Sequence, residues 1–299
     1  MNISLDALAV LDAIDRRGSF AAAAEEMHRV PSAVSYTIQK LEQDIGISLF
    51  NRSGHRAVLT EAGQEMLHEG RHLLLAATTL ESRVKRVATG YEAELRIAVS
   101  DLIPLPRLYP LIGEFYGENC NTRLQLLREV YGGGWDALAA GRADLSLGVP
   151  GEVPAGGGYV TRMLGMLEFV FAVAPQHPLA KAPEPLTKEA ILAHRAIAAA
   201  DSSRNLAPRT SGILSGQDVL TVPDTQSKLE AHIYGLGVGY LPKSIAERCA
   251  ALGTLIIKTV EEPKPPTPFF LAWRSQHSGR ALNWFVERLE KIPLQDLLN

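Results

Sequence analysis

The sequence predicts an α/β protein with a helix-rich N-terminal domain, and three patterns support this prediction. Three short amphipathic helices and a hairpin fill the first sixty residues. One long helix with a seven-residue apolar repeat follows, and beyond it short strands alternate with helices. Because 299 residues exceed one ordinary core, we expect three regions, with the boundaries 1–60, 61–90 and 91–299.

The composition is that of a soluble globular protein, with 46% hydrophobic and 21% charged residues. No apolar run reaches membrane length, and the first residues lack the basic cluster of a signal peptide, so we expect a cytoplasmic protein without a membrane partner. The net charge of −3 confines any nucleic-acid site to a local basic patch. Cys120 and Cys249 fit no metal spacing, and we interpret them as idle thiols, with a redox switch as the alternative.

The first two helices have clear start and stop signals. Ser4 can cap the first helix, and Gly18 can end it. Ser19 can cap the second helix, residues 20–27. Four consecutive small side chains in that second helix allow another helix to approach closely.

A third helix begins at Pro31, which suits a first turn because its missing N–H would be unpaired there in any case. Apolar residues recur every three or four positions from Val34 to Ile45 and form a core face. The opposite face carries small or polar groups that can reach base edges or phosphates in a major groove. With Arg29 just before the helix, these candidate DNA contacts are Ser32, Ser35, Tyr36 and Gln39.

A hairpin follows, because two short extended runs flank Ser53-Gly54. Arg52, His55 and Arg56 lie at its tip, where cations suit phosphates or a minor groove. Three helices and a hairpin also suit a protein-interaction module, so these residues alone leave DNA binding and protein binding open.

The long helix runs from Thr60, a plausible N-cap, to about Ala88. Its apolar residues form a heptad seam, which predicts pairing with a second copy of the chain. Packing onto its own domain is the alternative, and Gly70 with the small Ala77 would permit close approach between copies. The seam consists of Met66, Leu73, Ala77, Leu80 and Val84.

The strand–helix alternation after residue 90 predicts a parallel sheet. Ligands of such sheets bind at the carboxyl ends of the strands. Several acids at those ends favour a neutral, hydroxylated or cationic effector; the alternative is that nearby Arg128, Arg142 or Arg204 reverses the sign of the local charge. We interpret Gly132–Gly134 as a flexible turn, because it lacks the lysine and spacing of a nucleotide loop. The candidate effector residues are Ser100, Asp101, Glu129, Pro150, Asp201 and Thr225.

No catalytic motif stands out, because the chain has neither a nucleophile elbow nor a phosphate-binding loop. His68 and His72 are four residues apart on the long helix, but no carboxylate motif accompanies them. We therefore expect no enzyme activity, no cofactor and no metal.

The chain as a whole resembles the LysR-type transcriptional regulators. Two segments resemble their helix-turn-helix, a third their wing, and three more their effector domain. These segments are Gly18-Ser19-Phe20 with Ala23-Ala24; Ser32-Ala33-Val34-Ser35 with Ile38, Leu41 and Glu42; Leu49-Phe50 through Arg52, Arg56 and Leu59-Thr60 to Ala62-Gly63; Gly141–Leu145; His177–Ala180; and Gly235–Pro242.

The resemblance implies a winged helix-turn-helix, a linker helix and a two-lobed effector domain like the periplasmic binding proteins of type 2. Lobe I would span about 91–162 and 269–299, and lobe II about 163–268. The family usually has Ser or Thr where Val30 stands, commonly Gln where Pro31 stands, and Arg where Tyr36 stands. These departures put the usual base contacts in doubt.

The function implied is a transcription factor that binds promoter or operator DNA as a homodimer, in this family often as a homotetramer. A small-molecule effector in the cleft would change DNA spacing or bend, and so RNA polymerase recruitment. The alternatives are a ligand-binding protein of the periplasmic type without DNA function, and a bilobal enzyme.

Overall fold

The structure is a computed structural model of the chain, and it describes residues 3–51, 58–89, 91–118, 122–154, 156–209 and 212–298. The chain divides into two compact units, Met1–Val87 and Ala88–Asn299. No helix within the described ranges combines the length and the apolarity of a membrane span.

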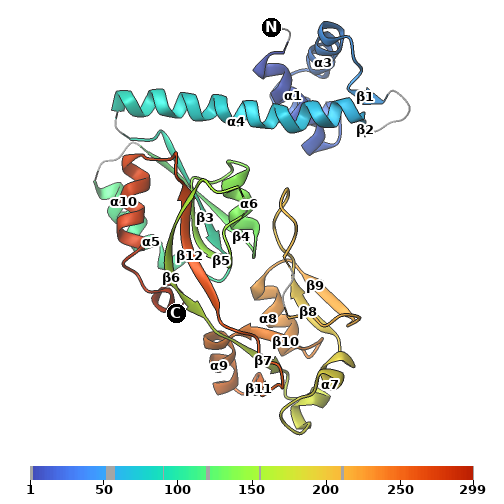
Figure 1. Cartoon of the computed structure of the whole chain (residues 1–299), viewed down its shortest axis with the longest axis vertical. Coiled ribbons are helices and arrows are strands. Elements are labelled where there is room, and N and C mark those ends of the chain that lie inside the picture. Colours follow the sequence, from blue (N-terminus) through green and yellow to red (C-terminus); the bar gives the residue numbers. More distant parts are fainter. Residues whose placement is uncertain are drawn as a thin grey trace. The chain divides into compact units, whose positions relative to one another are not determined.

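The first unit is a helical head with a small hairpin, continued by one long helix (Figure 1). The predicted caps are present: the Ser4 hydroxyl accepts from the Ala7 N–H at 3.1 Å, and the Ser19 hydroxyl accepts from Ala22. Its elements are α1 (Leu5–Arg17), α2 (Phe20–Glu26), α3 (Pro31–Ile45), β1 (Phe50–Asn51), β2 (Val58–Leu59) and α4 (Glu61–Thr89).

The core of the head joins all three short helices to the start of α4. Ala23 and Ala24 are buried, so the small side chains of α2 do allow close helix packing. Leu67 of α4 belongs to the same core, and a Cβ on Gly70 would lie 2.9 Å from Leu8 Cδ2. Gly70 therefore serves contact with α1 of its own head, which corrects the expectation that it faces a second copy.

The second unit contains two lobes, each built on its own sheet (Figure 1). Lobe I holds a five-stranded sheet in the order β4-β3-β5-β12-β6. The first three strands are parallel, as predicted, but β12 is antiparallel to both its neighbours, so the sheet is mixed. Its elements are β3 (Glu94–Ser100), η1 (Leu105–Arg107), α5 (Tyr109–Gly117), β4 (Arg123–Glu129), α6 (Gly133–Ala139), β5 (Leu145–Pro150), β6 (Tyr159–Leu167), β12 (Thr267–Arg274), α10 (Arg280–Leu289) and α11 (Leu294–Leu298).

Lobe II contains the three-stranded sheet β10-β7-β11 and the parallel pair β8-β9. The chain crosses between lobes after Leu167 and before Thr267, a few residues from the crossings expected at 162–163 and 268–269. Its elements are β7 (Phe169–Val173), η2 (Pro178–Lys181), α7 (Lys188–Leu192), β8 (Ala196–Ala199), β9 (Val219–Val222), α8 (Thr225–Ile233), β10 (Gly239–Pro242), α9 (Lys243–Ala251) and β11 (Ile256–Lys258).

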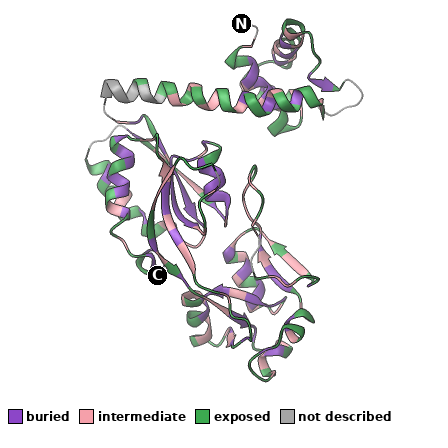
Figure 2. Ribbon diagram, viewed as in Figure 1, coloured by how far each residue is buried: buried purple, intermediate pink, exposed green. Residues whose placement is uncertain are grey.

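Buried residues concentrate on the central strands of lobe I and on the helices that cover them (Figure 2). Phe115 of α5 packs edge-on against Trp284 of α10, with ring centroids 5.1 Å apart. Trp135 of α6 is buried in a separate cluster. Close packing of these side chains against the sheet of lobe I fixes the positions of the ends of β3 and β5.

Candidate functional site

A cavity of about 480 Å³ lies between the two lobes of the second unit. Lobe I contributes the ends of β3 and β5, and lobe II contributes the start of β7, the strand β10 and the first turns of α8. This volume falls within the range of small-molecule sites. The lining residues are Ser100, Asp101, Leu102, Tyr131, Pro150, Gly151, Phe169, Pro208, Arg209, Thr225, Lys228, Tyr240, Leu241, Pro242, Lys264, Thr267 and Phe269.

Four of the six predicted effector residues line this cavity: Ser100, Asp101, Pro150 and Thr225. Asp101 Oδ2 accepts from the Thr225 N–H at 2.8 Å, so the end of β3 is joined to the first turn of α8. Burial raises the pKa of Asp101, although this hydrogen bond opposes the rise. Their role toward an effector stays a prediction.

The other two predicted residues, Glu129 and Asp201, do not line the cavity. Glu129 is buried, pairs with the Arg142 guanidinium and accepts a hydrogen bond from Ser202. The buried Asp136 carboxylate binds the other side of the same guanidinium at 3.0 Å. The expectation that Glu129 faces a ligand is therefore wrong, because its charge is already compensated within lobe I.

Asp201 begins a loop, residues 201–209, that we call the crossing loop because it leaves lobe II and packs onto α6 of lobe I (Figure 1). Asp201 accepts backbone N–H groups from Gly132 at 3.0 Å and from Arg209 at 2.7 Å. Asp136 accepts those of Asn205 and Leu206, both at 2.8 Å. Asp201 thus holds backbone N–H groups of both lobes and is not on the cavity lining, which corrects its predicted place in the effector site.

Gly132–Gly134 provides the surface on which the crossing loop rests. A Cβ on Gly133 would lie 1.8 Å from Ser202 Oγ, and a Cβ on Gly132 would lie 2.9 Å from an Asp201 carboxylate oxygen. This segment is the closely packed start of α6, and its interpretation as a flexible turn is wrong.

Three cationic side chains that were not among the predicted effector residues also line the cavity: Arg209, Lys228 and Lys264. Lys228 comes from α8 and is only 6% exposed. Lys264 Nζ lies 3.7 Å from the centroid of the Phe169 ring. Burial lowers the pKa of both lysines to about 8, and for Lys228 the neighbouring Lys264 charge adds to that effect.

The predicted DNA face of α3 lies at the surface of the first unit. Ser32, Tyr36 and Gln39 are exposed, and Ser35 is half-buried. Tyr36 is 66% exposed, so its ring and hydroxyl are accessible from the solvent. The helix starts without a side-chain cap at Val30, as predicted, so its first turn depends on Pro31.

The predicted basic residues of the head divide into two groups. Arg29 is exposed and forms a two-pronged ion pair with Asp6, at 2.7 Å and 3.0 Å. Arg52, His55 and Arg56 lie outside the described residues, between β1 and β2.

Two family descriptions match the chain. The one named "Bacterial regulatory helix-turn-helix protein, lysR family" matches residues 5–64, and "LysR substrate binding domain" matches residues 88–292. The chain belongs to the LysR family. The resemblance stated from the sequence motifs is thereby confirmed, and this LysR protein is a DNA-binding transcriptional regulator with an effector-binding domain.

Relatives cover almost the whole regulator. "Uncharacterized HTH-type transcriptional regulator YeeY" of Escherichia coli strain K12 is 43% identical over 285 residues, which cover 95% of this chain and 92% of that protein. "Probable HTH-type transcriptional regulator YhaJ" of the same strain is 39% identical over 290 residues, which cover 97% of both. The solved full-length Vibrio cholerae virulence activator AphB shares the fold, with a TM-score of 0.56 at 17% identity over 96% of this chain and 98% of that one.

The seam predicted on α4 of this LysR protein has two parts. Met66 is half-buried and packs against the core of its own head. Further along, Leu73 is 52% exposed, and Leu80 and Val84 are each 62% exposed, with Ala77 half-buried between them. The exposed apolar stripe therefore begins at Leu73.

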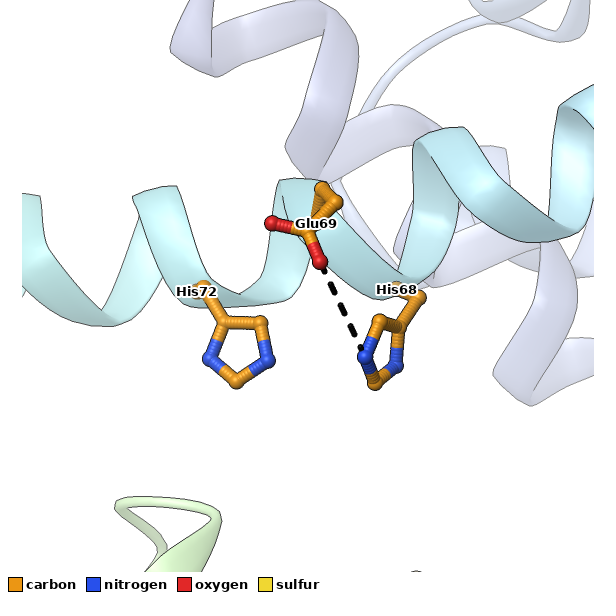
Figure 3. Close-up of side chains that lie close together, drawn as sticks. All are labelled: His68, Glu69 and His72. Carbon is orange, nitrogen blue, oxygen red and sulfur yellow. Dashed lines mark ion pairs between the residues drawn. The ribbon is translucent and has the colours of Figure 1, made fainter.

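His68, Glu69 and His72 form an exposed cluster on α4, with potential ligand atoms within 4.8 Å of one another (Figure 3). His68 Nε2 lies 3.8 Å from Glu69 Oε1. No carboxylate motif accompanies the histidine pair in the sequence, but Glu69, the residue after His68, lies beside it in the structure. We assign no metal to this cluster, because exposed groups of this kind are common on helices without an ion.

Proposed function

We propose that this LysR protein binds operator DNA as a homodimer and that a small molecule in the interlobe cavity controls the DNA-bound state. The observation that carries the proposal is the cavity itself, whose lining comes from both lobes. A ligand that touches both lobes binds one lobe spacing better than another and so shifts their equilibrium. Effector and DNA affinities are then linked reciprocally.

The DNA contacts of this proposal lie on the exposed face of α3. Ser32, Ser35, Tyr36 and Gln39 can donate or accept hydrogen bonds, and the Gln39 amide suits a bidentate contact with adenine. Arg52, His55 and Arg56 are assigned to the phosphates or the minor groove from the sequence alone. Arg29 belongs to this set only if DNA phosphates displace its partner Asp6.

The dimer contacts lie on the exposed stripe of α4. Leu73, Leu80 and Val84 leave a large apolar surface in water, and a second copy of the helix would cover it. Ala77 lies at a position where only a small side chain lets two helices approach closely. Pairing would place two copies of α3 at two half-sites separated by a whole number of DNA turns. Dimers of this kind are the unit from which a tetramer would form.

Control of transcription follows from the coupling of these parts. A change of lobe spacing alters the separation or the bend of the bound half-sites and so the recruitment of RNA polymerase. No step of this scheme requires a catalytic group or a cofactor.

A gel-shift and footprinting experiment tests the proposal. Genomic fragments retained by the full chain in the presence of competitor DNA are expected to show a protected pair of half-sites, with an affinity that falls steeply with salt. Gln39→Ala should weaken specific binding by about 1–3 kcal/mol and leave nonspecific binding unchanged. The matched control is Gln64→Ala, an exposed glutamine on α4. The absence of any retained fragment at all salt concentrations would refute the DNA contacts proposed.

A further inference from the structure

The charge of the interlobe cavity is opposite to the one that the sequence suggests. Of the acids at the strand ends, only Asp101 reaches the lining, whereas Arg209, Lys228 and Lys264 all do. The lining therefore carries three cationic side chains and one carboxylic side chain. This excess of positive charge makes the site favourable for an anion.

Lys228 is the least exposed of these cations and has no partner of opposite charge. No ion pair or hydrogen bond joins its Nζ to another residue in the described part of the chain, and the Asp101 carboxylate on the same lining is bonded to the Thr225 N–H. A buried ammonium without a partner is costly, and proteins normally pair such groups. The structure leaves the compensating charge to be supplied from the cavity.

Lys264 adds a second positive charge to the same wall. Its Nζ lies over the face of Phe169, a contact that orients the ammonium group but does not neutralise it. The charge on Lys264 lowers the pKa of Lys228, because the two ammonium groups repel each other. One anionic group near both lysines would reduce the repulsion between them. It would also offset the free-energy cost of the buried charge on Lys228.

Asp101 does not supply this charge. Its carboxylate accepts from the first N–H of α8, and burial raises its pKa. Arg209 donates to the backbone carbonyls of Pro150 and Glu152, at 3.0 Å and 3.2 Å, which fixes its guanidinium at the cavity wall and leaves its charge unpaired. Among the other acids at strand ends, Glu129 pairs with Arg142, Asp201 accepts backbone N–H groups, and Asp224 caps α8.

The remaining lining is apolar. Aromatic and aliphatic side chains from both lobes surround the lysines, and a cavity of about 480 Å³ has room for a body larger than an inorganic ion. An apolar body gains free energy by leaving water for this wall. The apolar contributors are Leu102, Phe169, Tyr240, Leu241, Pro242 and Phe269.

We infer that the effector is a small organic anion, a carboxylate or a phosphate with an apolar body, whose charged group binds Lys228 and Lys264. This inference rests on the proposed function, because it names the ligand class of the same cavity. It replaces the neutral or cationic effector expected from the acids of the sequence.

Matched probes test the inference on the full chain at pH 7. The set contains phenylacetate, phenylacetamide and phenethylamine, with phenyl phosphate to separate carboxylate from phosphate recognition. Thermal shift and calorimetry are expected to show binding of an anionic member, with the amide and the amine at least about tenfold weaker. Binding of the amide or the amine as tightly as the anions would overturn the inference, and so would binding of no probe at all.

Two lysine variants locate the binding group. Lys228→Met and Lys264→Met should each weaken anion binding by at least about tenfold. Lys188→Met, at an exposed lysine of lobe II, is the matched control and should bind as the wild type does. Anion binding that survives both cavity substitutions would contradict the assignment. Lysine-dependent anion binding that leaves the DNA footprint unchanged would instead refute the proposed coupling and leave this inference intact.

The pH dependence gives a second readout. An anion binds protonated lysines better than neutral ones, and both lysines have a pKa of about 8. The affinity for the anion should therefore be highest below pH 8 and fall by about tenfold per pH unit just above pH 8. Burial raises the pKa of Tyr131 to about 12 and lowers that of His232 to about 4, so neither titrates in this range. A flat profile from pH 7 to 9.5 would oppose the inference. Other charged or titratable groups in this region are Asp101, Arg209 and Tyr240 on the lining, Asp224 at the N-cap of α8, and Arg128, whose charge acts on both acids.

Discussion

Replacing Lys228 with Met should stabilise the unliganded protein, the reverse of what most core substitutions do. Burial lowers the pKa of Lys228 from 10.5 to about 8. Since one pKa unit corresponds to about 1.4 kcal/mol, the protonated side chain destabilises the folded state by about 3 kcal/mol at pH 7. Methionine has a similar length and an apolar end, so Lys228→Met removes this cost and keeps the packing.

The sign of the pH dependence follows from the direction of the pKa change. Below pH 8 the lysine is protonated in both the folded and the unfolded states, and the full cost is present. Between pH 8 and 10.5 the unfolded state binds more protons than the folded state, so the stability contributed by the wild-type lysine rises with pH. The advantage of Lys228→Met should therefore shrink across this window.

Urea unfolding followed by tryptophan fluorescence measures this difference. All three tryptophans, Trp135, Trp273 and Trp284, lie in the second unit, so the signal reports the unit that holds Lys228. With a slope of about 3 kcal/mol per molar urea, the midpoint should rise by about 1 M at pH 7. The exposed control Lys188→Met should change the free energy of unfolding by less than about 0.5 kcal/mol.

Two results would refute the reasoning about Lys228. One is a Met variant that is less stable than the wild type at pH 7, because the lysine would then have a stabilising partner. The other is a stability difference that is the same at pH 7 and pH 10, because burial of the charge would then not be its cause.

Three further substitutions probe the other parts of the molecule. Leu80→Asp should raise the dimer dissociation constant measured by sedimentation velocity at least about 100-fold, because two apolar side chains are replaced by facing charges. Leu192→Asp in lobe II is the control and should leave the dimer unchanged. A Leu80→Asp variant that still dimerises as the wild type does would exclude the α4 stripe as the dimer contact. Gly133→Ala should cost more than about 2 kcal/mol in urea, because its Cβ would overlap the crossing loop, whereas Gly117→Ala has open space and should be neutral or stabilising. Arg142→Met should cost about 3–5 kcal/mol at pH 7, because two buried carboxylates lose their cation; a loss below 1 kcal/mol would show that they are not ionised.

The head was predictable because its signals are local. Ser4 and Ser19 cap helices through side chains three residues from their partners, and the helix bounds follow from these caps. The seam of α4 was predictable only in part. A heptad pattern does not distinguish apolar residues that pack on their own head, such as Met66, from those that remain exposed, such as Leu80.

The charge of the effector site was not predictable, because it depends on pairings between residues far apart in sequence. Glu129 and Asp201 look alike in the sequence at the ends of strands, and their partners lie on other elements. Lys228 follows the N-cap of α8 by one turn, where a lysine usually faces water, whereas here it is only 6% exposed and lines the cavity between the lobes. The sequence of β6 shows no regular alternation of buried and exposed residues, and the strand is defined by its pairing with β12.

The contacts of α4 with its own head attach the first part of this helix rigidly to the head. Leu67 belongs to the core of the head, and Arg71 pairs with Asp12 and Asp15 of α1, so this stretch and the head move as one body. Leu80 lies thirteen residues further along, which is about 20 Å at 1.5 Å per residue. In the proposed dimer, a rotation of about 10° about Leu80 would carry the head by about 3.5 Å, close to the spacing of one base pair. If the proposed dimer forms through Leu80, a small change of angle at that contact would shift α3 by about one base step along the DNA.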